Sequence, residues 1–425
     1  MITRLILLHR VLHNGQLNPG DLQALQLRKL QETLQFAREH VPYYRHLFNE
    51  SGIHPRDISG PDDLKKIPVS TKDDLRHAGT ENLVACNVDT GKLTAALTSG
   101  TSGKPFRVML SAHERKLRRY IDFRTLLNVG FRPRDQLVTL GPRLAMRRGL
   151  HEHLGLFRTD RLNNRLPPHE IVRQLESLRP DILWIYPSIL RSLLVNAGRD
   201  ALRGFTPRAI INAAETEDRS LLRKAWGEAD IEYFNFYGSI ETGRIAWECR
   251  AHEGLHVNTD HLLLELEPIQ GMEAGTSGGP GHVVITTLNM RSMPFIRYRL
   301  GDLCSLVKGD CPCGSSYPRI TSPIGRENSL AKLSSGRHVS ALEFTRVLRQ
   351  FEWIEQFRVT QLQQGKFTIA VLASDPANDA KLAHVHAALI KQLGEPADIM
   401  FTFVRKLEQV GDKFLDFIIA GTESP

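Results

Sequence analysis

Long apolar runs are absent from this sequence of 425 residues, and no stretch approaches the roughly 20 residues needed to cross a bilayer. The first ten residues carry one basic side chain before a short apolar run, but they lack a full apolar core and a small-residue cleavage site. They are therefore not typical of a signal peptide. We expect a cytoplasmic location and no membrane partner.

Cysteine is also scarce, because five scattered residues are too few for a disulfide scaffold. Neither a helix-turn-helix motif nor an aromatic RNA-binding signature is present, so the net charge of +8 does not by itself favour nucleic acid. That charge admits smaller anionic partners, such as a nucleotide polyphosphate or coenzyme A. Internal repeats and low-complexity segments are missing too.

The length predicts two or three domains. An apolar repeat at helical spacing begins near residue 21 and ends before Pro42. Further along, short β-rich runs alternate with helical patterns, which predicts an α/β fold with largely parallel sheets. The expected strands cover 136–140, 181–186, 208–212 and 231–237, and the expected helices cover 169–178 and 218–229.

Strand-like segments dominate 255–325, and the pattern changes after residue 326. We therefore expect a large N-terminal domain at 1–325, with a helical opening at 1–90 and a β-rich segment at 245–325. A small α+β domain should follow at 326–425. Its expected elements are a helix at 341–351, strands at 357–362 and 367–372, a helix at 377–394 and a strand at 398–404.

A glycine- and hydroxyl-rich run has the composition of a phosphate-binding loop, since glycines let backbone N–H groups turn inward and a lysine adds charge. It is not a Walker motif, because only two residues separate its glycines. Strand-like flanks at 93–97 and 106–110 predict a hairpin, and a plain flexible turn is the alternative. The run is Thr98, Ser99, Gly100, Thr101, Ser102, Gly103, Lys104 and Pro105.

A metal site is predicted from the cysteines. Cys311 and Cys313 lie in a Gly/Pro/Ser-rich turn, and Cys249 lies upstream near His252 and His256. Three cysteines and one histidine would form a closed tetrahedral zinc site, which is typical of structural zinc. Free buried cysteines are the alternative, and either histidine could complete the set.

The run at 98–105 resembles the phosphate loop of the acyl-adenylate-forming superfamily. The closer resemblance is to the phenylacetate–coenzyme A ligase family, with its capsular-polysaccharide-biosynthesis-like relatives. Stretches 39–45 and 64–75 resemble that family's helical opening. Further matches follow in order to the C-terminus, so the resemblance spans essentially the whole chain.

This resemblance implies a role for each matching motif. The segment 213–216 resembles the lining of the adenine pocket, and 237–242 resembles a motif whose tyrosine lies near adenine and whose glutamate holds Mg²⁺. The segment 297–302 resembles a motif whose aspartate binds the ribose hydroxyls. The pair 325–326 resembles the start of the hinge into a mobile C-terminal domain, and 411–418 resembles the terminal segment that carries the adenylation lysine.

Carried onto this sequence, the implied catalytic residues are Lys104, Glu241 (Mg²⁺) and Lys413. The implied zinc ligands are Cys249, His256, Cys311 and Cys313. The sequence departs from the family's pattern at Ile240, Asn328 and Asp412. The implied nucleotide-binding residues are Thr98, Ser99, Gly100, Thr101, Ser102, Gly103, Ala214, Glu215, Tyr237, Gly238, Ser239, Asp302 and Arg326.

The implied activity is that of an AMP-forming acid–thiol ligase using ATP, Mg²⁺ and coenzyme A, with a structural Zn²⁺. The acid pocket should be lined from 186–188, Ala213 and Phe236. One alternative passes the acyl group to an amine or carrier in surface-polysaccharide assembly. Another is a degenerate nucleotide-binding protein, suggested by the three departures. The identity of the acid, the acyl acceptor and the oligomeric state, with a homodimer among the options, stay open.

Overall fold

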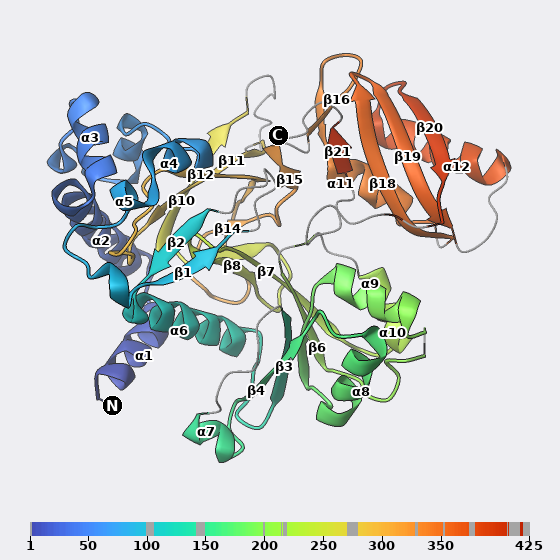
Figure 1. Ribbon diagram of the computed structural model, residues 1–425, viewed down its shortest axis with the longest axis horizontal. Coiled ribbons are helices and arrows are strands. Elements are labelled where there is room, and N and C mark those ends of the chain that lie inside the picture. Colours follow the sequence, from blue (N-terminus) through green and yellow to red (C-terminus); the bar gives the residue numbers. More distant parts are fainter. Residues whose placement is uncertain are drawn as a thin grey trace.

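The computed structural model describes residues 2–98, 106–141, 149–198, 200–213, 215, 219–269, 279–327, 330–351, 353–373, 379–405, 407 and 417–419. Figure 1 shows the α/β arrangement of these residues, with helices at the N-terminal side and a group of strands and helices at the C-terminal side. No helix among the described residues is both long and apolar enough to cross a membrane.

The N-terminal part of the chain is helical, as expected. Its main helix begins after Asn18, whose side chain accepts the backbone N–H of Asp21 at 2.9 Å. It ends before Pro42, which starts the next helix. The elements are α1 (Ile2–Asn14), α2 (Pro19–His40), α3 (Pro42–Glu50), η1 (Pro55–Asp57), η2 (Pro61–Lys66), α4 (Lys72–Ala78), α5 (Thr80–Leu83) and η3 (Thr90–Lys92).

The largest sheet has nine strands within the described residues. The neighbours β4, β3, β5, β6 and β7 run parallel. From β7 to β13 every pair is antiparallel. The order is β13 (Leu306–Val307), β14 (Arg319–Ile320), β9 (Leu255–Val257), β8 (Gly243–Glu248), β7 (Glu232–Ser239), β6 (Ala209–Ala213), β5 (Ile182–Trp184), β3 (Gln136–Gly141) and β4 (Arg158–Asn163).

The strands expected at 136–140, 181–186, 208–212 and 231–237 are β3, β5, β6 and β7, and they form the parallel half of a mixed sheet, as expected; the pairing becomes antiparallel beyond β7. The physical reason is the connection, because β7 and β8 are joined by the short turn 240–242. A turn of that length joins antiparallel strands, whereas a parallel pair needs a crossover of a dozen or more residues.

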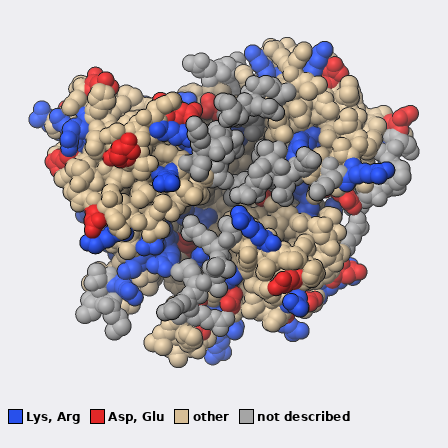
Figure 2. All heavy atoms as spheres, in the orientation of Figure 1, with Lys and Arg blue, Asp and Glu red and all other residues tan. Residues whose placement is uncertain are grey.

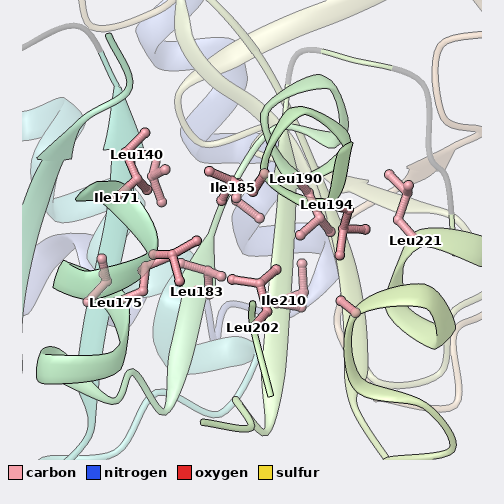
Figure 3. Close-up of a cluster of buried hydrophobic side chains, with 14 of the residues drawn as sticks. Leu140, Ile171, Leu175, Leu183, Ile185, Leu190, Leu194, Leu202, Ile210 and Leu221 are labelled. Carbon is pink, nitrogen blue, oxygen red and sulfur yellow. The ribbon is translucent and has the colours of Figure 1, made fainter. Parts of the chain in front are cut away.

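Helices cover both faces of the parallel half. On one face α8 (Pro168–Leu178), α9 (Pro187–Asn196) and α10 (Ser220–Trp226) pack leucines and isoleucines against Leu183 and Ile210 (Figure 3). On the other face α6 (Ala112–Asn128) contributes Leu126 to a second core that contains Ile211, Phe234 and Phe236. A one-turn helix, α7 (Leu150–His153), precedes β4.

A second, antiparallel sheet lies between the N-terminal helices and the antiparallel half of the large sheet. Leu263, Leu288 and Ile296 share a core with α2 and α3, while Val283 and Ile285 share another with Tyr237. Its order is β10 (Leu262–Pro268), β11 (Gly281–Thr287), β12 (Tyr298–Cys304) and β15 (Gly325–Arg326).

The expected hairpin around the glycine-rich run has both of its flanks. Strand β1 (Thr94–Leu97) pairs antiparallel with β2 (Arg107–Leu110), with Leu97 opposite Arg107. The loop residues 99–105 lie outside the described part of the chain. The fold therefore presents the two ends of this loop side by side.

The elements expected after residue 326 are present and form their own core. Phe344, Phe357, Ile369, Leu389 and Phe417 are among its members, all from beyond residue 330. These elements are β16 (Leu330–Lys332), β17 (His338–Ser340), α11 (Ala341–Leu348), β18 (Ile354–Gln363), β19 (Lys366–Ala373), α12 (Asp379–Leu393), β20 (Asp398–Phe403) and β21 (Phe417–Ile419).

One buried ion pair joins the helical layer to the sheets. Two guanidinium nitrogens of Arg124 on α6 donate to the two carboxylate oxygens of Asp260 at 2.9 and 2.8 Å, and both side chains are 3% exposed. Asn14 and Tyr317 donate to the same carboxylate at 3.1 and 2.9 Å. Burial alone would raise the pKa of Asp260, but the charge of Arg124 outweighs it and holds the pKa well below its usual range.

Replacing Arg124 with methionine should lower the free energy of unfolding by about 3–5 kcal/mol, because it leaves a buried carboxylate without its counter-ion. Chemical denaturation measures this loss. The matched control is Arg203→Met, which removes an arginine 67% exposed from a surface pair with Asp200, and it should cost less than about 1 kcal/mol. Equal losses in the two variants would contradict a special role for the buried pair.

Candidate active site

Three of the residues expected at a nucleotide meet where the two sheets come together. The hydroxyl of Tyr237 on β7 donates to Asp302 Oδ2 at 2.8 Å. Arg326 Nε lies 3.3 Å from Asp302 Oδ1, and the two residues are register partners on β12 and β15. A tyrosine, a carboxylate and an arginine from three strands are thus held in one place.

The carboxyl of Asp302 is largely shielded from water. Burial raises its pKa above the ordinary value, while the charge of Arg326 and the hydrogen bond from Tyr237 oppose that rise. The same burial, together with the charge of Asp302, raises the pKa of Tyr237, so its hydroxyl stays protonated and can donate. A carboxylate in this setting is suited to accept hydrogen bonds from a pair of neighbouring hydroxyls.

Glu241 lies in the turn between β7 and β8 and is 6% exposed. Its Oε1 accepts the Tyr298 hydroxyl at 3.2 Å, and Lys72 Nζ on α4 lies 3.8 Å from the same oxygen. Burial lowers the pKa of Lys72, and the charge of Glu241 opposes that effect. A buried carboxylate and a half-buried lysine therefore lie next to each other here.

Two side chains from outside this turn hold its backbone. Arg118 on α6 donates to the carbonyl oxygens of Ile240 and Glu241 at 2.8 and 2.5 Å. His261 is fully buried, and its Nε2–H donates to the carbonyl of Thr242 at 3.0 Å. Burial lowers the pKa of His261 to about 4, so its ring is neutral at physiological pH.

The hydroxyl of Ser239 forms hydrogen bonds within the turn itself. It lies 3.0 Å from Thr242 Oγ1 and accepts the Thr242 backbone N–H at 3.1 Å. Ile240, which stands where the family's pattern has a hydroxyl, is 37% exposed. Gly238 lies so close to β8 that a Cβ would meet the carbonyl oxygen of Gly243 at 2.6 Å.

Other expected residues are described only in part. Thr98 is buried, and its hydroxyl accepts the Phe106 N–H at 3.1 Å, so it closes the base of the hairpin. Glu215 accepts from the backbone N–H and hydroxyl of Ser188 at 2.7 and 2.5 Å. The remaining members lie outside the described residues: Ser99, Gly100, Thr101, Ser102, Gly103, Lys104, Ala214, Asn328, Asp412 and Lys413.

An open cavity of about 620 Å³ lies on the Tyr237 face of β7. Asn235, two residues before Tyr237 and on the same face of the strand, is part of its lining, together with Thr321 and Ser322. The cavity wall also includes Arg219, which lies over the ring of Tyr233 at 5.4 Å. Tyr237, Asp302 and Arg326 are not among its lining residues, so the cavity borders the same strand as the Tyr237–Asp302 pair without including that pair.

The four expected zinc ligands come together. The ligand atoms of Cys249, His256, Cys311 and Cys313 all lie within 4.8 Å of one another. Cys249 Sγ is 3.5 Å from Cys311 Sγ, and Cys313 Sγ is 3.3 Å from His256 Nε2. The alternative histidine points elsewhere, because His252 Nδ1 lies 3.1 Å from Glu248.

Sequence reasoning missed Lys72, Arg118 and Tyr298 as parts of this site. Lys72 lies inside a stretch that was noted only for its resemblance, directly after the capping residue Thr71. Tyr298 lies between two arginines of the ribose motif. Arg118 lies on a helix with several basic residues, and Figure 2 shows lysines and arginines gathered over α1 and α6. Its sequence context therefore did not distinguish it from a solvated basic face.

Comparison with known proteins gives a consistent result, although no family model matches the chain. Phenylacetate-coenzyme A ligase of Escherichia coli (strain K12) is 31% identical over 313 residues, which cover 71% of this chain and 71% of that protein. The enzyme of the same name from Thermus thermophilus is 28% identical over 324 residues, 73% of this chain and 71% of that protein.

Solved structures confirm the expected fold class. The chain superposes on 2-hydroxyisobutyryl-CoA ligase in the postadenylation state, in complex with R3-HIB-AMP, with a TM-score of 0.81. The match has 19% sequence identity and covers 96% of this chain and 91% of that chain.

The neutral, buried state of His261 predicts a pH dependence of stability. The unfolded histidine binds a proton below about pH 6.5, whereas the folded pKa is about 4. The free energy of unfolding should therefore be fully retained above about pH 6.5 and fall by about 3 kcal/mol as the pH drops towards 4. His261→Gln should flatten this part of the profile, while His46→Gln, at a side chain 73% exposed, should not. If the free energy of unfolding depends on pH in the same way in the wild-type, His261→Gln and His46→Gln proteins, the neutral, buried state of His261 is refuted.

Proposed function

The chain belongs to the phenylacetate–coenzyme A ligase family of adenylate-forming enzymes, and from that premise we propose that it activates a carboxylic acid with ATP and passes the acyl group to coenzyme A. The products are an acyl-coenzyme A thioester, AMP and pyrophosphate. The observation that carries the proposal is the contact of Tyr237, Asp302 and Arg326 where the two sheets come together. We place the reaction in the cytoplasm, where ATP and coenzyme A are available.

In the first step, an oxygen of the substrate carboxylate attacks the α-phosphorus of ATP, and the bond to pyrophosphate breaks. Asp302 would accept the ribose hydroxyls, and Tyr237 would pack against the adenine. Fixing both ends of the nucleoside presents the α-phosphorus to the acid, so part of the entropic cost of reaction is met on binding.

Several positively charged groups would stabilise the negative charge of the phosphates. Glu241 would hold Mg²⁺, which supplies positive charge to the phosphate oxygens. Lys72, 3.8 Å from the same carboxylate, would contribute a second cation at that corner. Lys104 in the glycine-rich loop and Lys413 near the C-terminus would add donors where negative charge develops.

In the second step, the thiol of coenzyme A attacks the acyl carbonyl, and AMP leaves with the electron pair of the mixed anhydride. The thiol would take the place beside the acyl-phosphate bond that Lys413 holds in the first step. We therefore propose that the domain at 326–425 turns about a hinge that begins at Gly325–Arg326. Its separate hydrophobic core supports movement as a unit.

Acid-dependent exchange of labelled pyrophosphate into ATP tests the first step, and thioester formation with coenzyme A tests the second. Asp302→Asn should raise the KM for ATP by about tenfold or more, because it weakens charge-assisted contacts to the ribose. Asp200→Asn, which changes an exposed carboxylate, is the matched control. Exchange without thioester would favour an amine or carrier as acceptor, and no exchange with any acid would contradict the function.

We further propose that Cys249, His256, Cys311 and Cys313 hold one structural Zn²⁺. In a tetrahedral zinc site, neighbouring ligand atoms lie about 3.6–3.8 Å apart, close to the 3.5 and 3.3 Å separations here. His256 Nδ1 lies 3.0 Å from the carbonyl of Tyr317 and must donate to it, which leaves the Nε2 lone pair facing the cysteines. The donor set is therefore suited to zinc and leaves no position for substrate.

Elemental analysis should find one zinc per chain. Cys313→Ser should reduce that content and lower the melting temperature by about 5–10 °C, since metal binding contributes directly to folding. Cys86→Ser is the control, because Cys86 is exposed and lies outside the cluster. A metal-free protein with an unchanged melting temperature would rule out the structural zinc.

A further inference from the structure

An arginine lies on the face of β7 opposite to Tyr237. Arg244 on β8 is the register partner of Gly238. Its guanidinium carbon lies 4.5 Å from the ring centre of Phe236 and 4.8 Å from that of Trp184. Phe236 and Tyr237 are successive residues of one strand, so their side chains point to opposite faces. Arg244 is thus separated from the ribose site by the strand itself.

This arginine is 9% exposed, which is unusual for a charged side chain. Its Nε donates to Asp122 Oδ1 on α6 at 3.0 Å. The two terminal nitrogens have no hydrogen-bond partner among the described residues. Asp122 therefore fixes the plane of the guanidinium and leaves its forked end available.

The surroundings favour a ligand with a planar pair of oxygens. The two aromatic faces hold the guanidinium by cation–π attraction and cover its flat sides. A guanidinium fork matches a carboxylate with two parallel hydrogen bonds, and such a pair is stronger in a dry site. A purely apolar ligand would instead leave buried donors unsatisfied, which costs free energy.

The position of Arg244 matches that of the expected acid pocket. Trp184 and Phe236 belong to β5 and β7 near the carboxyl ends of the parallel strands, where α/β folds bind ligands. Between them Ala213 on β6 presents only a methyl group, and the rings of Trp184 and Phe236 contact each other edge to face with 5.4 Å between their centres. Tyr186 packs against the same core as Ala213 and Phe236. Glu215 is engaged by Ser188.

We propose that Arg244 binds a second carboxylate of the substrate, so that the preferred acid is a dicarboxylic acid, one carboxylate being activated and the other held by the arginine. Asp122 is a positioning residue that orients Arg244. This inference rests on the proposed acid activation and names the class of acid for that same site.

The test compares acids matched in size: hexanedioate with hexanoate, and 4-carboxyphenylacetate with phenylacetate. Wild-type protein should show the higher kcat/KM for each dicarboxylate in pyrophosphate exchange. Arg244→Met should lower that value by about 100-fold, while the value for each monocarboxylate changes less than about threefold. Arg244→Lys should retain part of the preference. Asp122→Asn should raise KM for the dicarboxylate more than it lowers kcat.

Arg173→Met, at an exposed position of α8, is the matched control and should leave the preference intact. Circular dichroism and ATP affinity establish that each variant is folded. Equal kcat/KM for both members of each pair in wild-type protein, with exchange intact, would overturn the role of Arg244 and leave the acid-activating function standing.

Calorimetric binding of hexanedioate separates the two proposals, because it needs no turnover. Binding by wild-type protein that Arg244→Met abolishes, without exchange for any acid, would keep the arginine's role and reject the ligase function. Binding that is equal in the two proteins would overturn the inference whatever the exchange assay shows.

Discussion

The buried contact between Arg124 and Asp260 is the constraint on which the arrangement of layers depends. A charge pair shielded from water needs hydrogen bonds from its surroundings. Here Asn14 and Tyr317 donate to the Asp260 carboxylate, and Lys29 donates to the backbone carbonyl of the same residue. The partners come from α1, α2, α6 and the loop before β14. Tyr317 also offers its carbonyl to His256, so the cysteine cluster and the helical layer share one anchor.

Strand β7 divides the candidate site into two environments. Tyr237 faces Asp302 and the second sheet, whereas Phe236 faces Trp184 and α6. The division falls where the large sheet changes from parallel to antiparallel pairing. Gly238, with no side chain, allows β8 to approach at this point. In the proposed function, one strand would therefore present a polar surface to the nucleotide and an aromatic one to the acid.

The sequence predicted features whose determinants are close together in the chain. Alternating strands and helices, the hairpin flanks and the ribose motif are local patterns, and the family resemblance and fold class are confirmed. The clustering of Cys249 with Cys311 could be predicted from the sequence because few residue types can form a metal site. Contacts such as Arg124–Asp260, Arg244–Asp122 and Lys72–Glu241 join residues far apart in sequence. No sequence periodicity predicts those pairings. The sequence also did not predict helix α9, of which only the first residues were expected, as part of a pocket lining.

The sheet of the C-terminal unit has an order that bears on how the protein is made. Strand β21 pairs in parallel with β18, although β19, α12 and β20 all come between them in the chain. Phe417 on β21 is part of the same core as Phe344. During synthesis the ribosome must therefore release β21 before this core can close, whereas the strands of the large sheet emerge much earlier. The core of this unit can therefore close only after the strands of the large sheet have left the ribosome, so the proposed hinge would join a later-folding unit to an earlier-folding one.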